Sequence, residues 1–440
     1  MADPIASADN GQSVFDALHP PAQNLIDTCV HCGWCLPTCP TYALWQEEMD
    51  SPRGRIYMMK MGLQGQSRWT EAFVEHFDRC LGCMACETVC PSGVQYGKLI
   101  EATRSQVERN TQRPLGERLL RRFIFSVFPH PGRLRALAAP LWFYQHLGIR
   151  WILHHAGLLK LLPRSIRSME TLLPPITWDG IRSQWPGVIP AQGEKRLRVG
   201  LLLGCVQRVF FPEVNRATAR VLSAEGCEVV VPEGQRCCGA LMVHAGEEEE
   251  ALVRARRMID LFEAAGVDVI AINAAGCGST MKEYGYLLRD DPRYAVRAEA
   301  FSAKCKDISE ILVDLHPRAK RNPISMRVAY HDACHLQHAQ RITKLPRELL
   351  RAIPGIEIVD IAESALCCGS AGIYNLVEAA TARELGDRKV QQVLATGADA
   401  VVSGNPGCLL QISTGLERAG KKMRVLHLVE LLDASIRGKK

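Results

Sequence analysis

The sequence predicts a multidomain α+β protein with an N-terminal, mainly α-helical domain, a helical linker and two repeated α/β domains rich in cysteine. Two cysteine runs with the same spacing lie before residue 100, a basic amphipathic stretch follows, and another cysteine pattern occurs twice after residue 200. Strand-like and helix-like segments alternate in that last part, which indicates α/β layering. The expected boundaries are a tail at 1–20, the helical domain at 21–105, the linker at 106–195, and the repeats at 196–320 and 321–440.

The two cysteine runs are near copies of each other, with CVHCGWCLPTCP at 29–40 and CLGCMACETVCP at 80–91. Both follow the spacing C-x2-C-x2-C-x3-C-P, which is typical of ferredoxin domains with two [4Fe-4S] clusters. Two-residue spacers let three thiolates converge on one cluster, so the fourth ligand comes from the other run. We therefore predict one cluster held by Cys29, Cys32, Cys35 and Cys90, and a second held by Cys80, Cys83, Cys86 and Cys39.

Three other uses of these thiols fit the pattern less well. Structural zinc usually takes two C-x2-C pairs rather than a triple run with a trailing C-P. A disulfide framework suits a small secreted chain, and catalytic C-x-x-C chemistry does not explain eight cysteines in two matching copies. The sequence favours iron–sulfur clusters, because soft thiolate ligands select them.

Composition restricts the remaining classes of function. Of the 440 residues, 47% are hydrophobic and 23% charged, which excludes wholesale disorder. The stretch 1–20 lacks an export signal, so we expect the 18 cysteines to stay in a reducing cytoplasm. The formal charge of +6 ignores the roughly −2 of each thiolate-bound cluster, so it gives no support for nucleic-acid binding. The longest apolar stretch, 136–149, is too short to span a membrane and contains Pro140.

The spacer at 41–79 carries apolar residues at helical spacing, so we expect helices between the two cysteine runs. It contains the segment SPRGRI at 51–56. Two interpretations of Arg53 and Arg55 stay open: they lie near a cluster or a partner carboxylate, or they occupy a solvated helix start.

The stretch 104–167 is rich in Arg, Leu, Trp and Pro and predicts basic amphipathic helices. These helices would pack on a neighbouring domain, dock a partner subunit or rest on anionic lipid, and packing is the default expectation. His154 and His155 are expected on a helix face rather than as metal ligands. A segment rich in Pro and Gly then leads to the first repeat.

The last part of the chain is an internal duplication made visible by its cysteines. Its first copy consists of Cys205, Cys237, Cys238 and Cys277, and its second of Cys334, Cys367, Cys368 and Cys408. Equivalent cysteines are 129, 130 or 131 residues apart, so the cysteine spacing of the two copies differs by at most two residues. Each strand is expected to deliver its cysteine on a turn at its carboxyl end, where α/β sheets hold ligands.

Each copy should gather four thiols at one point. Three interpretations stay open: a further iron–sulfur site of unusual shape in each copy, purely structural thiols, or thiol redox chemistry. Cys227 and Cys305 have no equivalent in the other copy and are expected to be buried or incidental. His244, His331 and His335 lie beside the cysteines, and we expect packing or hydrogen bonding near the site rather than ligation.

The segments CVHCGWCLPTCPTY, DSPRGRIY and DRCLGCMACETVCPSGVQYG, with the two Cys-Cys-Gly repeats, resemble the iron–sulfur subunits of bacterial glycolate oxidase. The resemblance implies partner subunits that carry FAD, oxidise glycolate to glyoxylate and pass electrons towards a quinone or another acceptor. Related proteins often end each repeat in C-x-x-C. This chain has Thr280 and Gln411 at those places, which departs from a five-thiol site.

No catalytic residue is expected in this chain. It has no G-x-G-x-x-G after a strand and no nucleophile with an evident base. The sequence therefore predicts an electron-transfer subunit in the cytoplasm, with contact to the cytoplasmic face of the inner membrane at most peripheral. The alternatives are an electron donor other than glycolate, such as glycerol-3-phosphate or lactate, a catalyst that reduces disulfides at the Cys-Cys-Gly sites, or a metal-bound scaffold.

Overall fold

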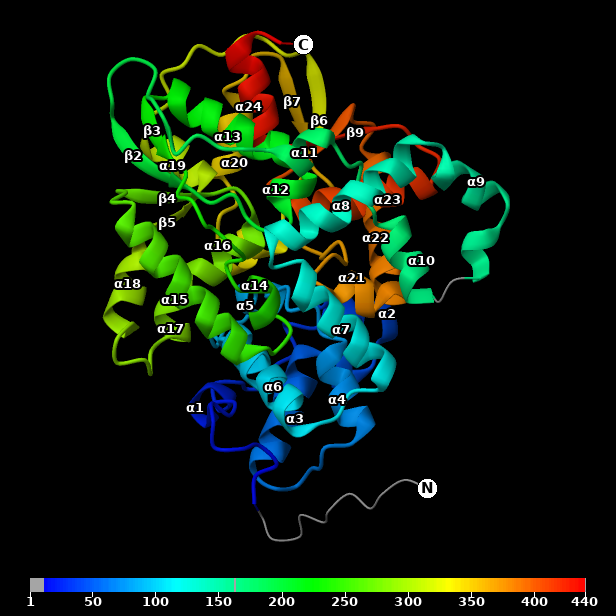
Figure 1. Cartoon of the computed structure of the whole chain (residues 1–440). Coiled ribbons are helices and arrows are strands. Elements are labelled where there is room, and N and C mark those ends of the chain that lie inside the picture. Colours follow the sequence, from blue (N-terminus) through cyan, green and yellow to red (C-terminus); the bar gives the residue numbers. More distant parts are fainter. Residues whose placement is uncertain (1–11, 162–163, 440) are drawn as a thin grey trace.

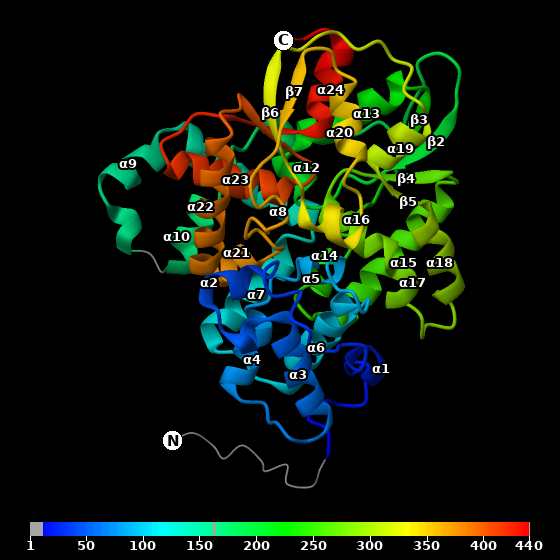
Figure 2. The ribbon, with the colours of Figure 1, turned by 180° about the vertical axis from the view of Figure 1, so that it is seen from behind.

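The computed structural model describes residues 12–161 and 164–439, so most of the predicted N-terminal tail lies outside the described residues. A helical N-terminal domain occupies one end of the molecule, and two sheets flanked by helices occupy the other (Figures 1 and 2). The linker helices run along the side of the C-terminal half. The predicted fold class is confirmed.

The N-terminal domain consists of short helices that leave the cysteine runs as loops. Its elements are α1 (Gln23–Ile26), α2 (Pro40–Trp45), η1 (Glu48–Asp50), α3 (Pro52–Leu63), α4 (Glu71–Asp78), α5 (Ala85–Thr88) and α6 (Tyr96–Asn110). The side chain of Ser51 caps α3 by accepting from the Gly54 N–H, and Pro52 follows at the first helical position. Helices α3, α4 and α6 bury Met59, Phe77 and Leu99 against one another.

The linker is helical, as expected. It contains α7 (Leu115–Val127), α8 (Pro131–His146), α9 (Ile149–His155), η2 (Leu158–Leu161), α10 (Arg164–Thr171) and α11 (Trp178–Arg182). Leu134 and Ala138 of α8 pack against Ile176 and against Val209 of the first repeat, so the expectation of packing holds for this helix. Helix α9 projects from the molecule, and α10 returns to lie beside α21 and α22 of the second repeat (Figures 1 and 2). Within the described residues, no helix is both long and apolar enough to cross a membrane.

The first repeat contains a five-stranded sheet in the order β1-β3-β2-β4-β5, parallel except for β1. Its strands are β1 (Val188–Ile189), β2 (Leu197–Leu201), β3 (Cys227–Val230), β4 (Val269–Ile272) and β5 (Cys305–Asp307). Its helices are α12 (Gln207–Phe210), α13 (Pro212–Ala224), α14 (Ala240–Val243), α15 (Glu248–Ala264), α16 (Ala275–Lys282), α17 (Tyr284–Leu287), α18 (Ala295–Lys304) and α19 (Ile308–Asp314).

The second repeat contains a parallel four-stranded sheet in the order β7-β6-β8-β9. Its strands are β6 (Met326–His331), β7 (Ile356–Val359), β8 (Ala400–Ser403) and β9 (Arg424–His427). Its helical elements are the π-helix η3 (His335–Ala339), α20 (Leu345–Arg351), α21 (Tyr374–Val377), α22 (Ala379–Ala395), α23 (Pro406–Arg418) and α24 (Leu428–Arg437).

The two repeats form one body because they share a hydrophobic core. Val199 and Val229 of the first sheet belong to the same buried cluster as Val328 and Val402 of the second. The His427 ring also bonds through Nε2 to the Asn273 carbonyl, at 2.9 Å, across the boundary between them. In both sheets the carboxyl ends of the parallel strands meet at one edge, and the repeat cysteines follow those ends.

Candidate cysteine-lined metal centres

One small cavity in the N-terminal domain is lined by the four cysteines predicted to share the first cluster. Cys29, Cys32 and Cys35 come from the loop between α1 and α2, and Cys90 follows α5. Cys86 also reaches this cavity. Burial raises the pKa of Cys35 to about 11, so a thiolate there needs a positive charge such as iron to stabilise it.

A second cavity is lined by the other predicted set. Cys80, Cys83 and Cys86 come from the second cysteine run, and Cys39 reaches in from the first. Burial raises the pKa of both Cys83 and Cys86 well above the ordinary value. The structure therefore brings each predicted set of four together with the two runs crossed, and the ligand assignment itself stays a prediction.

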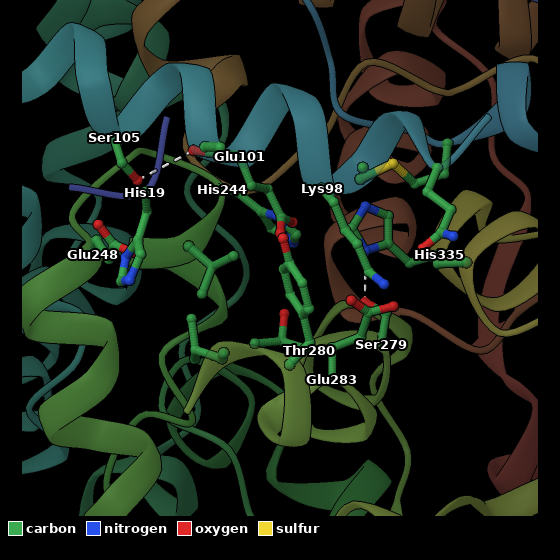
Figure 3. A pocket seen from close by; sticks show the side chains of 18 of the residues that line it. His19, Lys98, Glu101, Ser105, His244, Glu248, Ser279, Thr280, Glu283 and His335 are labelled. Atoms are coloured by element: carbon green, nitrogen blue, oxygen red, sulfur yellow. Dashed lines mark hydrogen bonds and ion pairs between the residues drawn. The ribbon is translucent and has the colours of Figure 1, made fainter. Parts of the chain in front are cut away.

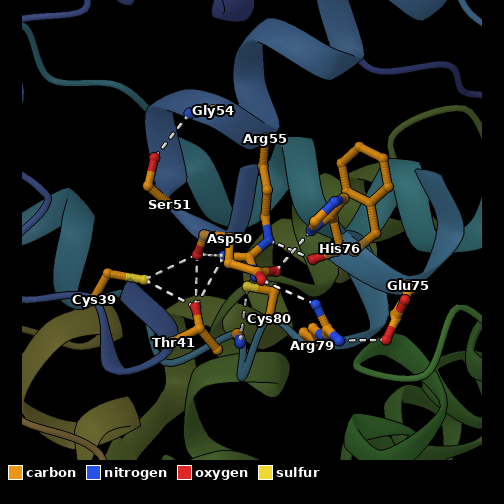
Figure 4. A network of polar contacts seen from close by, with 12 residues as sticks. Cys39, Thr41, Asp50, Ser51, Gly54, Arg55, Glu75, His76, Arg79 and Cys80 are labelled. Atoms are coloured by element: carbon orange, nitrogen blue, oxygen red, sulfur yellow. Dashed lines mark hydrogen bonds and ion pairs between the residues drawn. The ribbon is translucent and has the colours of Figure 1, made fainter. Parts of the chain in front are cut away.

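Arg55 lies in this second cavity with 0% exposure. Its guanidinium donates to the Asp50 carbonyl and to the Thr41 hydroxyl, and its Nη2 is 3.1 Å from Asp50 Oδ1 (Figure 4). Burial raises the pKa of Cys80, but the charges of Arg55 and Arg104 outweigh it and hold that pKa below its usual value. Arg55 thus favours the thiolate form that metal ligation requires.

Arg53 lies beside the first cavity, where it donates from Nη1 to the His31 carbonyl at 3.2 Å and pairs with Glu48 at 2.7 Å. Together with Arg55 it supports the interpretation that SPRGRI lies near the clusters, and not the solvated helix start.

The second cavity adjoins the second repeat. Leu81, Cys83 and Ala85 pack in one cluster with Leu366 and Cys367, and Cys334 packs against it. Burial first, and then the nearby Cys334 thiol, raise the pKa of Cys83. The His335 ring also contacts the Gly82 carbonyl through Nε2 at 3.0 Å. The sulfur atoms of the two regions are therefore neighbours.

The cysteines of the second repeat gather as predicted. The Sγ atoms of Cys334 and Cys367 are 3.9 Å apart. One ring nitrogen of His331 and the Sγ atoms of Cys368 and Cys408 all lie within 4.8 Å of one another. Asn405 donates to Cys408 Sγ at 3.3 Å. His331 lies beside these thiols as expected: after Cys367 and Cys408, its ring helps to lower the pKa of Cys368, although neither ring nitrogen makes a full hydrogen bond among the described atoms.

The first repeat gathers its four thiols in a chain of contacts. The neighbouring thiols Cys205 and Cys238 lower the pKa of Cys237, whereas contact with Cys237 raises the pKa of Cys205. Cys277 adjoins Cys238 and raises its pKa, after Cys237. One detail of the prediction is wrong: Cys277 lies in the first turn of α16, and its counterpart Cys408 in the first turn of α23. Short links after β4 and β8 let those helices begin at once.

The glycine after each cysteine pair adopts a left-handed conformation, with φ of +93° at Gly239 and +86° at Gly369. A Cβ at Gly369 would lie 2.5 Å from the Ala382 carbonyl oxygen of α22. Glycine therefore allows the paired cysteines to turn towards their site while the chain packs against the next helix.

The remaining sequence candidates are not among the gathered thiols, although Cys305 belongs to the same buried cluster as Cys238. Cys227 and Cys305 are buried in strands β3 and β5, as expected. His155 is exposed and its ring contacts the Trp151 carbonyl, which agrees with a helix-face residue. The side chain of His154 lies outside the described residues.

A further cavity of about 170 Å³ lies between the N-terminal domain and the two repeats, and sequence reasoning missed it because its lining comes from distant segments. Figure 3 shows Glu101 of α6 on one side and Glu283, which follows α16, on the other. Burial raises the pKa of each carboxyl to about 7. Burial also lowers the pKa of His244 to about 4, so this ring is neutral at pH 7.

Comparison with known proteins agrees with this arrangement. The 4Fe-4S dicluster domain matches 25–94, the linker region of the glycolate oxidase iron-sulfur subunit matches 116–173, and the cysteine-rich domain matches 199–282 and 328–413. A probable glycolate oxidase iron-sulfur subunit of Bacillus subtilis (strain 168) is 41% identical over 92% of both chains. This chain belongs to the family of glycolate oxidase iron–sulfur subunits.

The glycolate oxidase iron-sulfur subunit of Escherichia coli (strain K12) is 37% identical over 94% of this chain and 95% of its own. The lactate utilization protein A of Shouchella clausii (strain KSM-K16) is 31% identical over 54% of this chain and 99% of its own. The resemblance seen in the sequence is confirmed, and so are iron–sulfur clusters as the class of cofactor.

Proposed function

We propose that this chain is the electron-transfer subunit of a glycolate oxidase complex, which receives electrons from FAD-bearing partner subunits and passes them towards a quinone or another acceptor. The observation that supports it most is the series of adjoining sulfur sites formed by the first cavity, the second cavity and the second repeat. Bound clusters would accept one electron at a time. A partner flavin that has taken a hydride could then pass on its two electrons in separate steps.

The residues of this chain fit that cofactor. We assign as ligands of two [4Fe-4S] clusters the eight cysteines of the two crossed sets, and we assign to each repeat a further iron–sulfur site on its four thiols. Buried thiols with raised pKa values, such as Cys83 and Cys86, need a positive partner, and metal binding supplies it. Arg55 and Arg104 add fixed positive charge beside Cys80.

We place the flavoprotein contact at the first cavity. Cys32 is exposed there, whereas the cysteines of the second cavity are buried. Val30 and Trp34 of the same loop are 67% and 70% exposed, and Tyr57 of α3 lies exposed nearby, where its ring contacts His31. An apolar, aromatic surface around a solvent-reaching sulfur ligand suits a partner that must bring its redox group close.

We place the acceptor side at a lipid surface touched by α9 and η2, on the cytoplasmic face of the membrane. Trp151 and Leu161 are 64% and 81% exposed, and Ile152 is also exposed, whereas Arg150 of the same helix is paired with Glu170 at 2.9 Å. Exposed Trp and Leu side chains that lie close together fit a lipid interface. Trp151→Ser combined with Leu161→Ser should reduce sedimentation with vesicles that contain anionic lipid, whereas Val296→Ser on α18 should not. Equal sedimentation of all three proteins would contradict this placement.

The function is tested by adding donors to the complex assembled with its flavin subunits. Glycolate should produce the EPR signals of reduced [4Fe-4S] clusters within turnover time, and lactate or glycerol-3-phosphate should not. Signals that appear only with lactate or glycerol-3-phosphate would show that this compound, and not glycolate, is the electron donor. Clusters that never respond, together with disulfide reduction by the isolated chain, would favour the catalytic alternative at the Cys-Cys-Gly sites.

A further inference from the structure

His331 is the last residue of β6, and it is 1% exposed. Among the described residues, neither Nδ1 nor Nε2 of its ring has a hydrogen-bond partner. A buried imidazole that leaves both nitrogens unpaired loses its hydration without compensation, which is costly for each unsatisfied group. Such a side chain requires a partner that the protein atoms do not provide.

The neighbours of the ring identify that partner. One ring nitrogen, Cys368 Sγ and Cys408 Sγ lie within 4.8 Å of one another. Two histidines close by are fully paired instead: His335 contacts Gly82 and Ser279, and His338 contacts Thr88 and Ala365. Among the described residues, His244 also leaves one buried ring nitrogen, Nε2, unpaired, but only His331 leaves both, and it shares its space with two cysteines.

The first repeat has no such group. Leu202 stands three residues before Cys205, as His331 stands three residues before Cys334, and Leu202 is buried in an apolar cluster. Nor does the segment after Cys408 offer a fifth ligand, because Gln411 donates to the Ala382 carbonyl at 2.7 Å. The two repeats therefore differ chemically three residues before their first cysteine, where one has Leu202 and the other His331.

We propose that His331 is a ligand, through one imidazole nitrogen, to the iron–sulfur centre of the second repeat. This repeat then holds its centre with four thiolates and one imidazole, and the first repeat with thiolates alone. The inference rests on the proposed loading of the second repeat. A neutral imidazole adds no negative charge to the four thiolates, whereas a fifth thiolate at the same place would add one and lower the reduction potential of the centre.

The test uses the anaerobically purified full chain with ¹⁵N-labelled histidine, reduced and measured by pulsed EPR. A histidine nitrogen coupling should appear in the wild type, vanish in His331→Leu and His331→Cys, and persist in the matched control His338→Gln. His331→Leu installs the residue of the first repeat, and His331→Cys keeps a ligand, so iron content should survive in the latter while the potential of this centre falls.

Two results would overturn the inference. Coupling that persists in both His331 variants would show that another histidine is the ligand, and wild-type protein with iron in the second repeat but no coupling would show that none is. An iron content of about eight per chain, enough for two cubane clusters alone, would instead overturn the loading of the repeats. Electron transfer through the N-terminal clusters would stand in that case, which separates the two failures.

Discussion

Arg55 carries a positive charge into the sulfur-rich interior of the N-terminal domain. It is paired there with Asp50, which also contacts His76 and Arg79 at 3.0 and 3.2 Å. A buried cation beside a cluster of negative thiolates stabilises the oxidised cluster less than the reduced one, because reduction adds negative charge. Arg55 should therefore raise the reduction potential of the second cluster.

Replacing Arg55 with Met tests this charge directly. The variant leaves Asp50 with one partner fewer, so we expect a loss of about 3–5 kcal/mol of stability. It should also lower the potential of the second cluster in an EPR redox titration. Arg55→Lys is the matched control, since it keeps the charge and loses the planar hydrogen bonds. Equal potentials in the two variants would show that the charge has no influence on the cluster.

Glu101 gives the molecule a pH dependence whose sign follows from its pKa. The unfolded chain releases this proton near 4.5, whereas burial keeps it bound in the folded chain until about 7. Folding therefore loses stability as the pH rises from 4.5 to 7, and the full cost is present above 7. Glu101→Gln should make unfolding less dependent on pH in this window and stabilise the protein by about 1–3 kcal/mol at pH 8.

Denaturant unfolding between pH 5 and 8 measures this effect. The exposed Glu194 provides the control, because Glu194→Gln should leave the slope unchanged. If the free energy of unfolding had the same pH dependence in the wild type and in Glu101→Gln between pH 5 and 7, burial of Glu101 would have no effect on stability. Burial of His244 has its effect at lower pH. Its folded pKa is about 4, so below pH 6.5 the unfolded chain binds a proton there that the folded chain does not, and the protein loses stability as the pH falls.

At the scale of elements, the Cys-Cys-Gly loops depend on the left-handed glycine that joins each pair to the next helix. Gly369→Ala places a Cβ 2.5 Å from a backbone oxygen of α22, so either the loop or the helix must move. We expect a loss of about 3 kcal/mol or more, together with a changed EPR signal from the second repeat.

Gly234→Ala is the control for this substitution. Gly234 has φ of +78° with nothing within 4 Å of a Cβ, so it measures the conformational cost alone, about 1–2 kcal/mol. If Gly369→Ala cost no more than Gly234→Ala, the close packing of the loop against α22 would be unimportant.

Local spacing predicts the loops well because each N-terminal run carries three thiols on one short segment, and a constant offset relates the two repeats. Spacing alone left Arg55 open between two interpretations, since its burial depends on contacts with η1 and α4. His331 was expected to hydrogen-bond near the site, and only its surroundings in the fold reveal two unpaired nitrogens. The positions of Cys277 and Cys408 in helices depend on how promptly a helix follows each strand.

At the scale of the whole molecule, the crossed runs make the two N-terminal cavities interdependent. Cys86 lines both of them, and each run contributes to each. The second cavity also supports the second repeat through the cluster around Leu81 and Leu366. If the proposed centres are bound, loss of one is therefore expected to disturb its neighbours.

Cys83→Ser should consequently lose one cluster and weaken the other, because metal ligation contributes directly to folding. We expect iron to fall by more than four per chain and electron transfer from glycolate to stop in the assembled complex. Cys227→Ser, at a buried cysteine away from the cavities, is the control for introducing serine and should keep its iron. Full iron content and activity in Cys83→Ser would refute the crossed assignment.

The central claim is that sulfur atoms from the two crossed cysteine runs hold iron, so that this chain can transfer electrons. It is tested most directly by iron, zinc and acid-labile sulfide analysis of the anaerobically purified chain. We predict brown protein with more than eight irons per chain and matching sulfide, since the repeats are loaded in addition to two [4Fe-4S] clusters. Colourless protein that carries zinc in place of iron would contradict the account.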